Sequence, residues 1–566
     1  MEVSSLKLKM PLIKLRKEPV EKKSEAKKAK ILKESITAIE ELVQVSTRDP
    51  SWRILDSYYI YKPFVKISIA ETPKGPMYFV EEQGLDEEDK MALEKLYEIL
   101  MDEIRPPQRR EDLTDLRGYV FKEVERISEK YREKLGMVGS RRLKVMYYIE
   151  RNLLGYGVLD PIMKDPNIED ISCNGVGIPV FVWHRKYESI PSNITFAAEE
   201  ALNELIMKMA HMAGKHISIA YPILDAMLPE KHRVAATYGR EVSTKGPSFT
   251  IRKFREKPFS IIEVIEQGNI DALSAAYLWM LLEHGKTFMI AGGTGTGKTT
   301  MLNALSMFIK PGMKIVTIED TPELNLPHVN WVQLTSRETY VVGTQSLGTS
   351  VKLYDLVKLS LRYRPDYVIV GEVRGEEASV LFQAMATGHS GASTIHAETL
   401  DYAIKRLTSP PMNISPAYMK LMNVFMHIQR VITRVEKGVV KVRRRITVVQ
   451  EVEDFEKYRS ISVWDPRTDT HKVGLKESIH LEDVAAKKGW DLEDVIEEIK
   501  RRALVLEWMK EEGIKDAWDV SRIIFDYYYE PQLVYEKAVK RLTEIRGESK
   551  EKISEEITVE TRPDAG

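Results

Sequence analysis

The sequence predicts an α/β protein in which N-terminal α/β modules precede a nucleotide-binding domain. The first observation is the length of 566 residues, which exceeds what one hydrophobic core usually supports, so two or three domains are expected. The second is the alternation of strand-like and helix-like runs along most of the chain. The third is the octapeptide GGTGTGKT at 292–299, which stands between an apolar run and a helix-competent run.

The composition excludes several classes of protein. A formal net charge of -1, from 84 basic and 85 acidic residues, argues against a general attraction to nucleic acid. The single cysteine, Cys173, excludes an intrachain disulfide and a tetra-cysteine zinc module. No run approaches about eighteen consecutive apolar residues and no signal-peptide pattern is present. We therefore expect a soluble, intracellular protein whose contact with a membrane is peripheral.

Shifts in composition divide the chain into segments. Residues 1–34 are rich in lysine and nearly free of aromatic residues, so we expect a flexible basic arm. Such an arm either contacts an anionic membrane surface or is a solvated tail. The other expected segments are an α/β module at 35–135, a second α/β domain at 140–255, a hinge linker at 256–262, an ATPase domain at 263–505, a helical extension at 506–545 and a disordered tail at 546–566.

Hydrophobic periodicity predicts helices and strands in turn through the N-terminal half. Helices are expected over residues 36–45, 87–104, 116–135, 141–153 and 197–213, and strands over residues 64–69 and 179–184. Turn-rich sequence separates these runs, as expected for small α/β modules.

The octapeptide fits the pattern G-x-x-x-x-G-K-[ST], with Gly292, Gly297, Lys298 and Thr299 at the fixed positions. Its glycines let backbone N–H groups turn toward the phosphates of a nucleotide, and the following helix adds its positive N-terminal end. Lys298 supplies a mobile charge, and the Thr299 hydroxyl is placed to ligate Mg²⁺. The residues expected to bind ATP and Mg²⁺ are Gly292, Gly293, Thr294, Gly295, Thr296, Gly297, Lys298, Thr299 and Thr300.

Two strand-like runs after this loop end in acidic residues. The first, at 314–323, ends in a carboxylate cluster in which Glu323 suits a general base or a water-orienting group. An acidic turn of this kind is otherwise simply solvated. The second, at 366–372, ends in Gly371 and Glu372, with glycine where many phosphate-loop ATPases have aspartate. That glycine favours Mg²⁺ ligation by Thr299, with Glu372 acting through water. Either Glu323 or Glu372 can serve as the general base.

Two histidines lie in the Gly/Ser/Thr-rich segment that follows the second acidic strand. His389 and His396 fall in TGHSGASTIHA at 387–397 and are placed to sense the phosphate state of a bound nucleotide. We expect His396 in the catalytic site and His389 near the nucleotide. Neither is expected to ligate a metal, because no acidic or cysteine partner lies at ligand spacing.

In their order and spacing these segments resemble the secretion-superfamily ATPases, the motors of type II secretion, type IV pili, type IV secretion and the archaellum. The similarity covers about residues 140–450. The segments that carry it are 292–299, 318–323, 368–372 and 387–397, and the segments most similar to the archaeal branch are 151–187, 214–229, 248–254 and 326–334.

The resemblance implies a hexameric ring in which an N-terminal domain moves against a RecA-like C-terminal ATPase domain. It also implies arginines that reach the γ-phosphate from the N-terminal domain or a neighbouring subunit, where they stabilise developing charge. Arg233 and Arg252 lie where such arginines are expected, although the family motif usually reads Gly-Ser before the first and this chain has Lys231-His232. The implied partners are a polytopic membrane platform protein and other archaellum motor-complex proteins, without nucleic acid.

Within the archaeal branch, the stretch at 58–71 resembles the archaellum type slightly more, so we expect a motor for archaellum assembly and rotation. An assembly ATPase for a type IV pilus or a type II-like secretion system is the alternative. A RecA-like DNA-translocating motor would need basic and aromatic pore loops, and the near-neutral charge counts against it. A scaffold that binds but does not hydrolyse nucleotide is disfavoured because the loop and both acids are intact.

Overall fold

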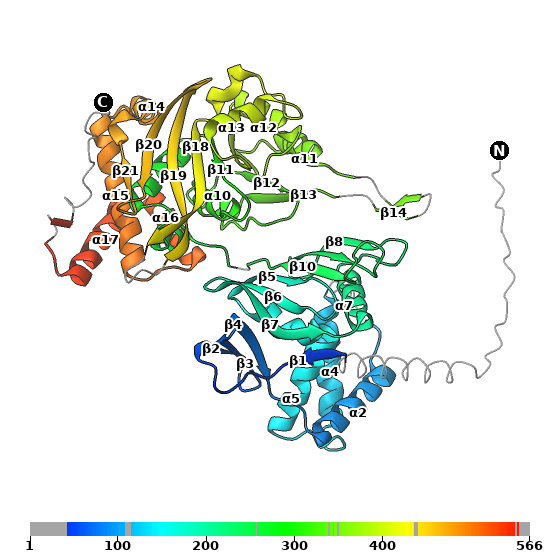
Figure 1. The fold of residues 1–566 in the computed structure, drawn as a ribbon. Helices are drawn as coiled ribbons and strands as arrows, with labels where there is room; N and C mark the ends of the chain where they lie inside the picture. The colour runs from blue at the N-terminus through cyan, green and yellow to red at the C-terminus, as the bar shows by residue number, and fades with distance from the viewer. Residues whose placement is uncertain are drawn as a thin grey trace, which may run out of the picture. The chain divides into compact units, whose positions relative to one another are not determined.

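The computed structural model describes residues 42–107, 115–255, 257–337, 340–342, 345–347, 350–434, 440–549 and 552–553. The chain divides into two compact units, Met1–Phe254 and Arg255–Gly566. Each unit contains a large sheet with helices packed on it (Figure 1), which confirms the expected α/β class. The basic arm expected at 1–34 and most of the tail expected at 546–566 lie outside the described residues.

The sheet of the N-terminal unit is mostly antiparallel. Its strands lie in the order β2 (Ile54–Tyr61), β3 (Val65–Thr72), β4 (Gly75–Glu82), β7 (Glu188–Phe196), β6 (Pro179–His184), β5 (Ile168–Cys173), β10 (Ser248–Arg252), β9 (Arg233–Thr237) and β8 (Ile223–Met227), and β1 (Val43–Val45) also pairs with β7. Strand β4 pairs with β7 through Tyr78 and Ser192. Strands from the two modules that the sequence separates therefore share one sheet and one core.

The helices of this unit follow the sequence periodicity closely. They are α2 (Glu87–Glu103), α4 (Leu116–Lys130), α5 (Ser140–Ile149), α6 (Asp160–Lys164) and α7 (Glu199–Met212), with a π-helical turn at Glu150–Leu154 and a 3₁₀ turn at Gly157–Leu159. Helix α2 begins at a reciprocal capping box between Asp86 and Asp89. The helix expected over 36–45 is wrong in its described part, because Val43 pairs with Phe196 and forms a strand.

The sheet of the C-terminal unit has a parallel half and an antiparallel half. Its order is β13 (Trp331–Thr335), β12 (Ile315–Glu319), β16 (Tyr367–Val370), β17 (Ser390–Ile395), β11 (Phe288–Ala291), β18 (Val424–Arg434), β19 (Val440–Asp454), β20 (Lys457–Asp465) and β21 (Thr470–Val473). Neighbours from β13 to β18 run parallel, and those from β18 to β21 run antiparallel. A separate hairpin joins β14 (Tyr340–Val342) and β15 (Gln345–Leu347).

Helices cover both faces of this sheet, and β16 shows how the two cores arise. Tyr367 and Ile369 face one helical layer, whereas Val368 and Val370 face the other. The first layer contains α8 (Ile261–Glu266), α9 (Ala272–Glu283), α10 (Lys298–Ser306), α14 (Ile479–Lys488), α15 (Leu492–Glu511), α16 (Ala517–Tyr529) and α17 (Pro531–Arg546), and the second α11 (Leu353–Ser360), α12 (Glu377–Ala386) and α13 (Leu400–Thr408). In Figure 1, α15 to α17 group together beside the antiparallel half.

Short 3₁₀ turns complete this unit at Leu361–Tyr363, Pro416–Leu421 and Leu475–Glu477. Within the described residues, no helix combines the length and the apolar character needed to cross a bilayer.

Candidate nucleotide-binding site

The functional residues of the C-terminal unit gather at one edge of its sheet. Because β12, β16, β17 and β11 are parallel neighbours, their carboxyl ends meet at the same edge. Glu323 lies four residues beyond β12, Glu372 two residues beyond β16, and His396 directly beyond β17. The loop at 292–297 follows β11 directly. The fold therefore brings together the loop, both candidate acids and one candidate histidine.

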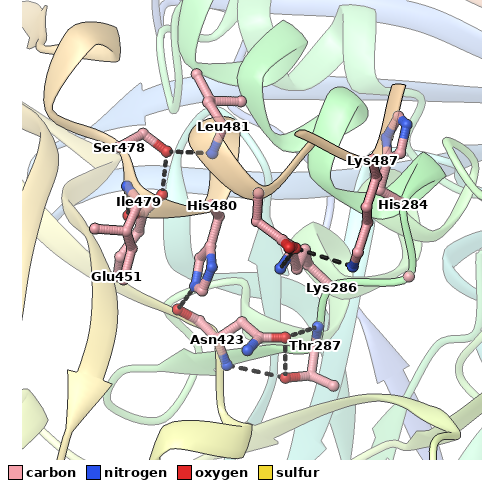
Figure 2. A network of polar contacts seen from close by, with 12 residues as sticks. His284, Lys286, Thr287, Asn423, Glu451, Ser478, Ile479, His480, Leu481 and Lys487 are labelled. Carbon is pink, nitrogen blue, oxygen red and sulfur yellow. Dashed lines mark hydrogen bonds and ion pairs between the residues drawn. The ribbon is translucent and has the colours of Figure 1, made fainter. Parts of the chain in front are cut away.

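The strand that leads into the loop, β11, is anchored at Thr287, the residue just before it (Figure 2). The Thr287 N–H donates to Oδ1 of Asn423 at 3.0 Å, and the Asn423 N–H donates to the Thr287 hydroxyl oxygen at 2.9 Å. Nε2 of His480, in α14, lies 3.0 Å from the Asn423 carbonyl oxygen. These contacts fix β11 against β18 and against α14, so the loop leaves the sheet from a defined position.

A buried carboxylate holds the start of α14 in the same network. Glu451, on β19, accepts hydrogen bonds from the Tyr277 hydroxyl at 2.5 Å, from the Ile479 N–H at 2.9 Å and from the Ser478 hydroxyl. Ser478 in turn caps α14 by accepting the Leu481 N–H at 3.0 Å (Figure 2). Hydrogen-bonded polar groups thus hold the edge of the sheet at which β11 and β18 begin, opposite the edge that carries the loop.

The loop itself needs glycine. Gly295 and Gly297 adopt φ values of +69° and +96°, which side chains rarely tolerate. A Cβ atom at Gly292 would lie 2.4 Å from the Ile428 carbonyl oxygen on β18. The Thr296 hydroxyl closes the turn by donating to the Gly293 carbonyl oxygen at 2.9 Å. The backbone therefore forms a tight cradle in front of α10.

Lys298 is the first residue of α10 and points back into this cradle. The residue is 9% exposed, and Nζ donates to the carbonyl oxygens of Gly292 at 3.0 Å and Gly293 at 2.9 Å. Burial lowers the pKa of the ammonium group, while the carboxylates of Glu372 and Glu323 act in the opposite direction. A partly desolvated cation beside inward-turned glycines is what a phosphate group would stabilise.

The acidic turn after β12 is organised by Glu319. This buried carboxylate accepts the N–H groups of Glu323 and Leu324, both at 2.9 Å, and the Gln333 side-chain amide at 3.2 Å. Burial is the main reason why the pKa of Glu319 rises to about 7. Glu319 shapes the turn, whereas the Glu323 side chain is exposed and available to solvent at this edge.

The second acidic strand end shows why glycine occupies position 371. A Cβ atom there would lie 3.0 Å from Cγ of Glu319, which is tighter than ordinary packing. Beyond it, Glu372 accepts a hydrogen bond from Nη2 of Arg374 at 2.6 Å. The Glu377 carboxylate accepts the N–H of Arg374 at 2.6 Å and thereby holds the loop that carries Glu372.

The structure separates the two histidines. His396 is exposed at the carboxyl edge, and its carbonyl oxygen accepts from Nη1 of Arg406 at 2.6 Å. His389 precedes β17 at the opposite edge, and its Nδ1 lies 3.2 Å from the Thr387 hydroxyl oxygen. A six-residue strand spans about 20 Å. This position argues against the predicted nucleotide-binding role of His389.

Two arginines that the sequence did not single out contact the loop from the antiparallel half of the sheet. Arg430, on β18, donates from Nε and Nη2 to the Gly295 carbonyl oxygen at 3.1 and 3.0 Å. Arg444, on β19, places Cδ 3.3 Å from the position of a Cβ atom at Gly297. For Arg444, the basic run RRR at 443–445 was a sequence signal that could have indicated a phosphate-binding role. Only the order of strands in the sheet shows that this run lies near the loop.

The two arginines expected to contact the γ-phosphate are neighbours in the N-terminal unit. Arg233 and Arg252 stand opposite each other in the β9–β10 ladder. Arg233 donates to both carboxylate oxygens of Asp225, at 3.2 and 2.9 Å, and Nε of Arg252 lies 3.4 Å from Oδ1 of Asp170. Both side chains line a concavity of about 370 Å³ on this sheet, beside Trp183.

The residues at the nucleotide edge suit a nucleotide with Mg²⁺. The cradle is one that a Cβ atom would fill, and the Lys298 ammonium is the cation within it. Thr299 lies half-buried beside Lys298, and Glu372 is half-buried two residues beyond β16, which β17 separates from β11. One hydroxyl, one nearby carboxylate, phosphate oxygens and water form the set of donors that Mg²⁺ takes in nucleotide sites.

Comparisons with known proteins find similarity to secretion system proteins and to an uncharacterized archaeal protein. Residues 166–469 match the family model described as type II/IV secretion system protein. An uncharacterized protein of Methanocaldococcus jannaschii is 36% identical over 478 residues, which cover 80% of this chain and 83% of that protein. A type IV secretion system protein PtlH homolog of Bordetella bronchiseptica is 34% identical over 229 residues, 37% of this chain and 66% of that protein.

Solved structures with related chains have low sequence identity. The VirB11 ATPase of the Brucella suis type IV secretion system is 24% identical, with a TM-score of 0.26, covering 54% of this chain and 97% of that one. The Legionella pneumophila ATPase DotB is 17% identical, with a TM-score of 0.37, covering 64% of this chain and 93% of that one. The family assignment follows from the family model and from the Methanocaldococcus relative.

Proposed function

The chain belongs to the type II/IV secretion system protein family, and we propose that it is an ATP-hydrolysing motor. One observation carries this proposal: the glycine cradle with its buried Lys298 shares a sheet edge with the strand-end acids Glu323 and Glu372. A phosphate loop accounts for nucleotide binding alone. The adjoining carboxylates supply what hydrolysis needs in addition, a group that orients or deprotonates water.

In this proposal the phosphates lie in the loop at 292–297, where backbone N–H groups and the Lys298 ammonium meet their charge. Thr299 would hold Mg²⁺ directly and Glu372 would hold it through water. Mg²⁺, when bound, neutralises charge on the phosphate oxygens. Glu323 or Glu372 orients the attacking water, with His396 exposed at the same edge.

We propose further cations around the phosphates. Arg233 and Arg252, from the same or a neighbouring subunit, would stabilise charge on the γ-phosphate. Arg430 already contacts the loop backbone at Gly295 and adds positive charge to the cradle from β18. Arg444 adds a second cation from β19, beside Gly297.

For the cellular role, we propose a homo-hexamer at the inner face of the cell membrane that drives filament assembly through a polytopic platform protein. The preference for an archaellum filament, with rotation as a second output, rests on the resemblance of the stretch at 58–71. A secretion system is the second candidate, and the name of the Bordetella relative favours it. Deletion of the gene, followed by electron microscopy and a motility assay, distinguishes loss of archaella from loss of pili or of secreted protein.

Two substitutions test the enzymatic proposal in the full-length protein. Lys298→Ala should abolish binding of a fluorescent ATP analogue, because it removes the cation in the cradle. Glu372→Gln should retain binding and lose most phosphate release. Lys310→Ala, at an exposed lysine beyond α10, is the control and should behave as the parent. Phosphate release by Glu372→Gln at the parental rate would show that Glu372 has no part in the reaction.

A further inference from the structure

The two residues before Arg233 are Lys231 and His232, whereas the family that this chain resembles usually has Gly-Ser there. The backbone of this loop is strained. Residues 228–232 join β8 to β9, with the Lys231 N–H donating to the Leu228 carbonyl oxygen at 2.9 Å. Lys231 adopts φ +63°, a left-handed conformation that costs a non-glycine residue about 1–2 kcal/mol. A strained residue that persists needs compensating contacts nearby.

His232 supplies such a contact to the end of the unit. Its side chain is buried, and Nδ1 accepts the Phe254 N–H at 2.9 Å. Burial, with the nearby Lys253 ammonium as the second cause, lowers the pKa of His232 to about 4, so the ring is neutral at pH 7 and Nδ1 can accept. The Lys231 ammonium also lies 5.4 Å from the ring centroid of Phe254.

The hydrogen bond between the Phe254 N–H and His232 lies beside the two arginines. Arg233 is the first residue of β9 and Arg252 is the last of β10, and the two are opposite partners. His232 and Phe254 lie just beyond them, so the histidine side chain continues the ladder where the backbone pairing ends. The bond therefore closes the end of the ladder at which both arginines stand.

Lys253, between Arg252 and Phe254, makes further hydrogen bonds that hold this segment. Its N–H donates to the Glu169 carbonyl oxygen at 2.8 Å, and Nζ donates to the carbonyl oxygens of Ile162, at 3.3 Å, and of Asp165. The Asp165 carboxylate is itself held by the Tyr78 hydroxyl at 2.7 Å. The chain is thus anchored up to the last residue of the N-terminal unit.

We propose that His232, which follows the strained turn at Lys231, clamps Phe254 to the N-terminal unit, so that the connector to the next unit begins at residue 255 and the arginine pair stays in place. His232 is then a positioning residue that acts through Phe254 and Arg252. On the other side, Arg255 is paired with Glu263 at 2.9 Å and Lys257 with Asp516 at 2.7 Å, so these residues beyond the boundary are held within their own unit. The catalytic consequence rests on the proposed ATPase activity, whereas the clamp itself does not.

Amide hydrogen exchange of the full-length protein tests the clamp directly. His232→Ala should raise the exchange rate of the Phe254 amide on the order of five-fold, the change that corresponds to a hydrogen bond of about 1 kcal/mol. His232→Asn, which keeps an acceptor near the Nδ1 position, should restore protection. Lys231→Gly should keep it too, because it relieves the turn and leaves the histidine. Replacing both with the family pattern, Lys231→Gly with His232→Ser, should lose it.

The same variants test the consequence for the reaction. His232→Ala should lower kcat several-fold with little change in KM, and His232→Asn should recover most of it. Unchanged exchange at Phe254 in His232→Ala and in the Gly-Ser double variant would overturn the clamp. Faster exchange with an unchanged kcat would overturn the positioning role alone. A parent protein without ATPase activity would overturn the proposed function and leave the exchange result standing.

Discussion

At the residue scale, the acidic end of β16 is shaped by the space available at position 371. A side chain there would press on Glu319, which is already buried and holds the turn that carries Glu323. An aspartate at this position would also set a second carboxylate beside one whose pKa is raised by burial. Glycine at 371 and a buried Glu319 are therefore linked features, and the first acid after β16 is Glu372, one residue further on.

Gly371→Ala should lower the free energy of unfolding of the C-terminal unit by about 1–3 kcal/mol, as expected for overpacking. Its Cβ atom would enter the 3.0 Å space beside Glu319. Urea unfolding followed by tryptophan fluorescence measures the effect. Gly84→Ala is the matched control, because a Cβ atom there meets nothing within 4 Å. Equal stabilities for the two variants would mean that a methyl group fits at position 371 without strain.

The buried histidine of the clamp predicts a pH dependence. The pKa of His232 falls from 6.5 to about 4 in the folded protein, so the unfolded chain binds more protons between these values. Stability should therefore decrease as the pH falls from about 6.5 toward 4, by at most about 1.4 kcal/mol per pH unit from this group. His232→Asn should flatten the dependence in urea unfolding at pH 7, 6 and 5. His211→Asn, at an exposed histidine of α7, should leave the slope unchanged.

At the element scale, local signals located most helices and strands, and tertiary pairing decided the rest. The capping box at Asp86 and the apolar run before the loop are local, and both elements were predicted. Strand β1 was missed because Val43 is extended only through its pairing with Phe196. Arg430 was missed because its contact with the loop depends on β18 lying beside β11. His389 lies at the other end of β17 from His396, because that strand separates two ends of a motif that is continuous in sequence.

Helices α9 and α15 meet at a buried charge. Arg502 is paired with Glu283 at 2.5 Å and with Glu498 at 3.1 Å, and its guanidinium carbon lies 5.0 Å from the ring centroid of Trp279. The Trp279 ring stacks at 5.1 Å on Phe308, two residues after α10. This cluster therefore supports the helix that follows the phosphate loop.

Arg502→Ala should destabilise the C-terminal unit by about 3–5 kcal/mol, because it removes the buried guanidinium that pairs with the partly buried carboxylates of Glu283 and Glu498. Glu283 then keeps the more distant Lys488 ammonium at 3.9 Å. Lys500→Ala, which removes a pair with Glu497 at the surface of the same helix, should cost less than about 1 kcal/mol. Urea unfolding of both variants measures the contrast. A cost for Arg502→Ala as small as that of Lys500→Ala would show that water or a rearranged neighbour replaces the guanidinium.

At the scale of the whole molecule, the proposed reaction requires residues from both units. The phosphate loop lies in the C-terminal unit, whereas Arg233 and Arg252 lie in the N-terminal unit. In a closed ring with a head-to-tail interface, a site completed across that interface couples hydrolysis in one subunit to the position of the next. This arrangement suits a motor because an isolated subunit, whose site is incomplete, would not hydrolyse ATP.

Mixing two inactive variants tests whether the arginines act across subunits. Lys298→Ala should lose nucleotide binding but keep its arginines, and Arg252→Ala should keep its loop but lose a γ-phosphate contact. In randomly mixed rings, about a quarter of the interfaces pair an intact loop with an intact neighbouring arginine, so about a quarter of parental phosphate release should return. The double variant Lys298→Ala/Arg252→Ala, mixed with Arg252→Ala, offers no such interface and should stay inactive. If the first mixture also stays inactive although native mass spectrometry shows mixed rings, each loop is served by the arginine of its own chain, and the coupling must then pass through the short connector after Phe254.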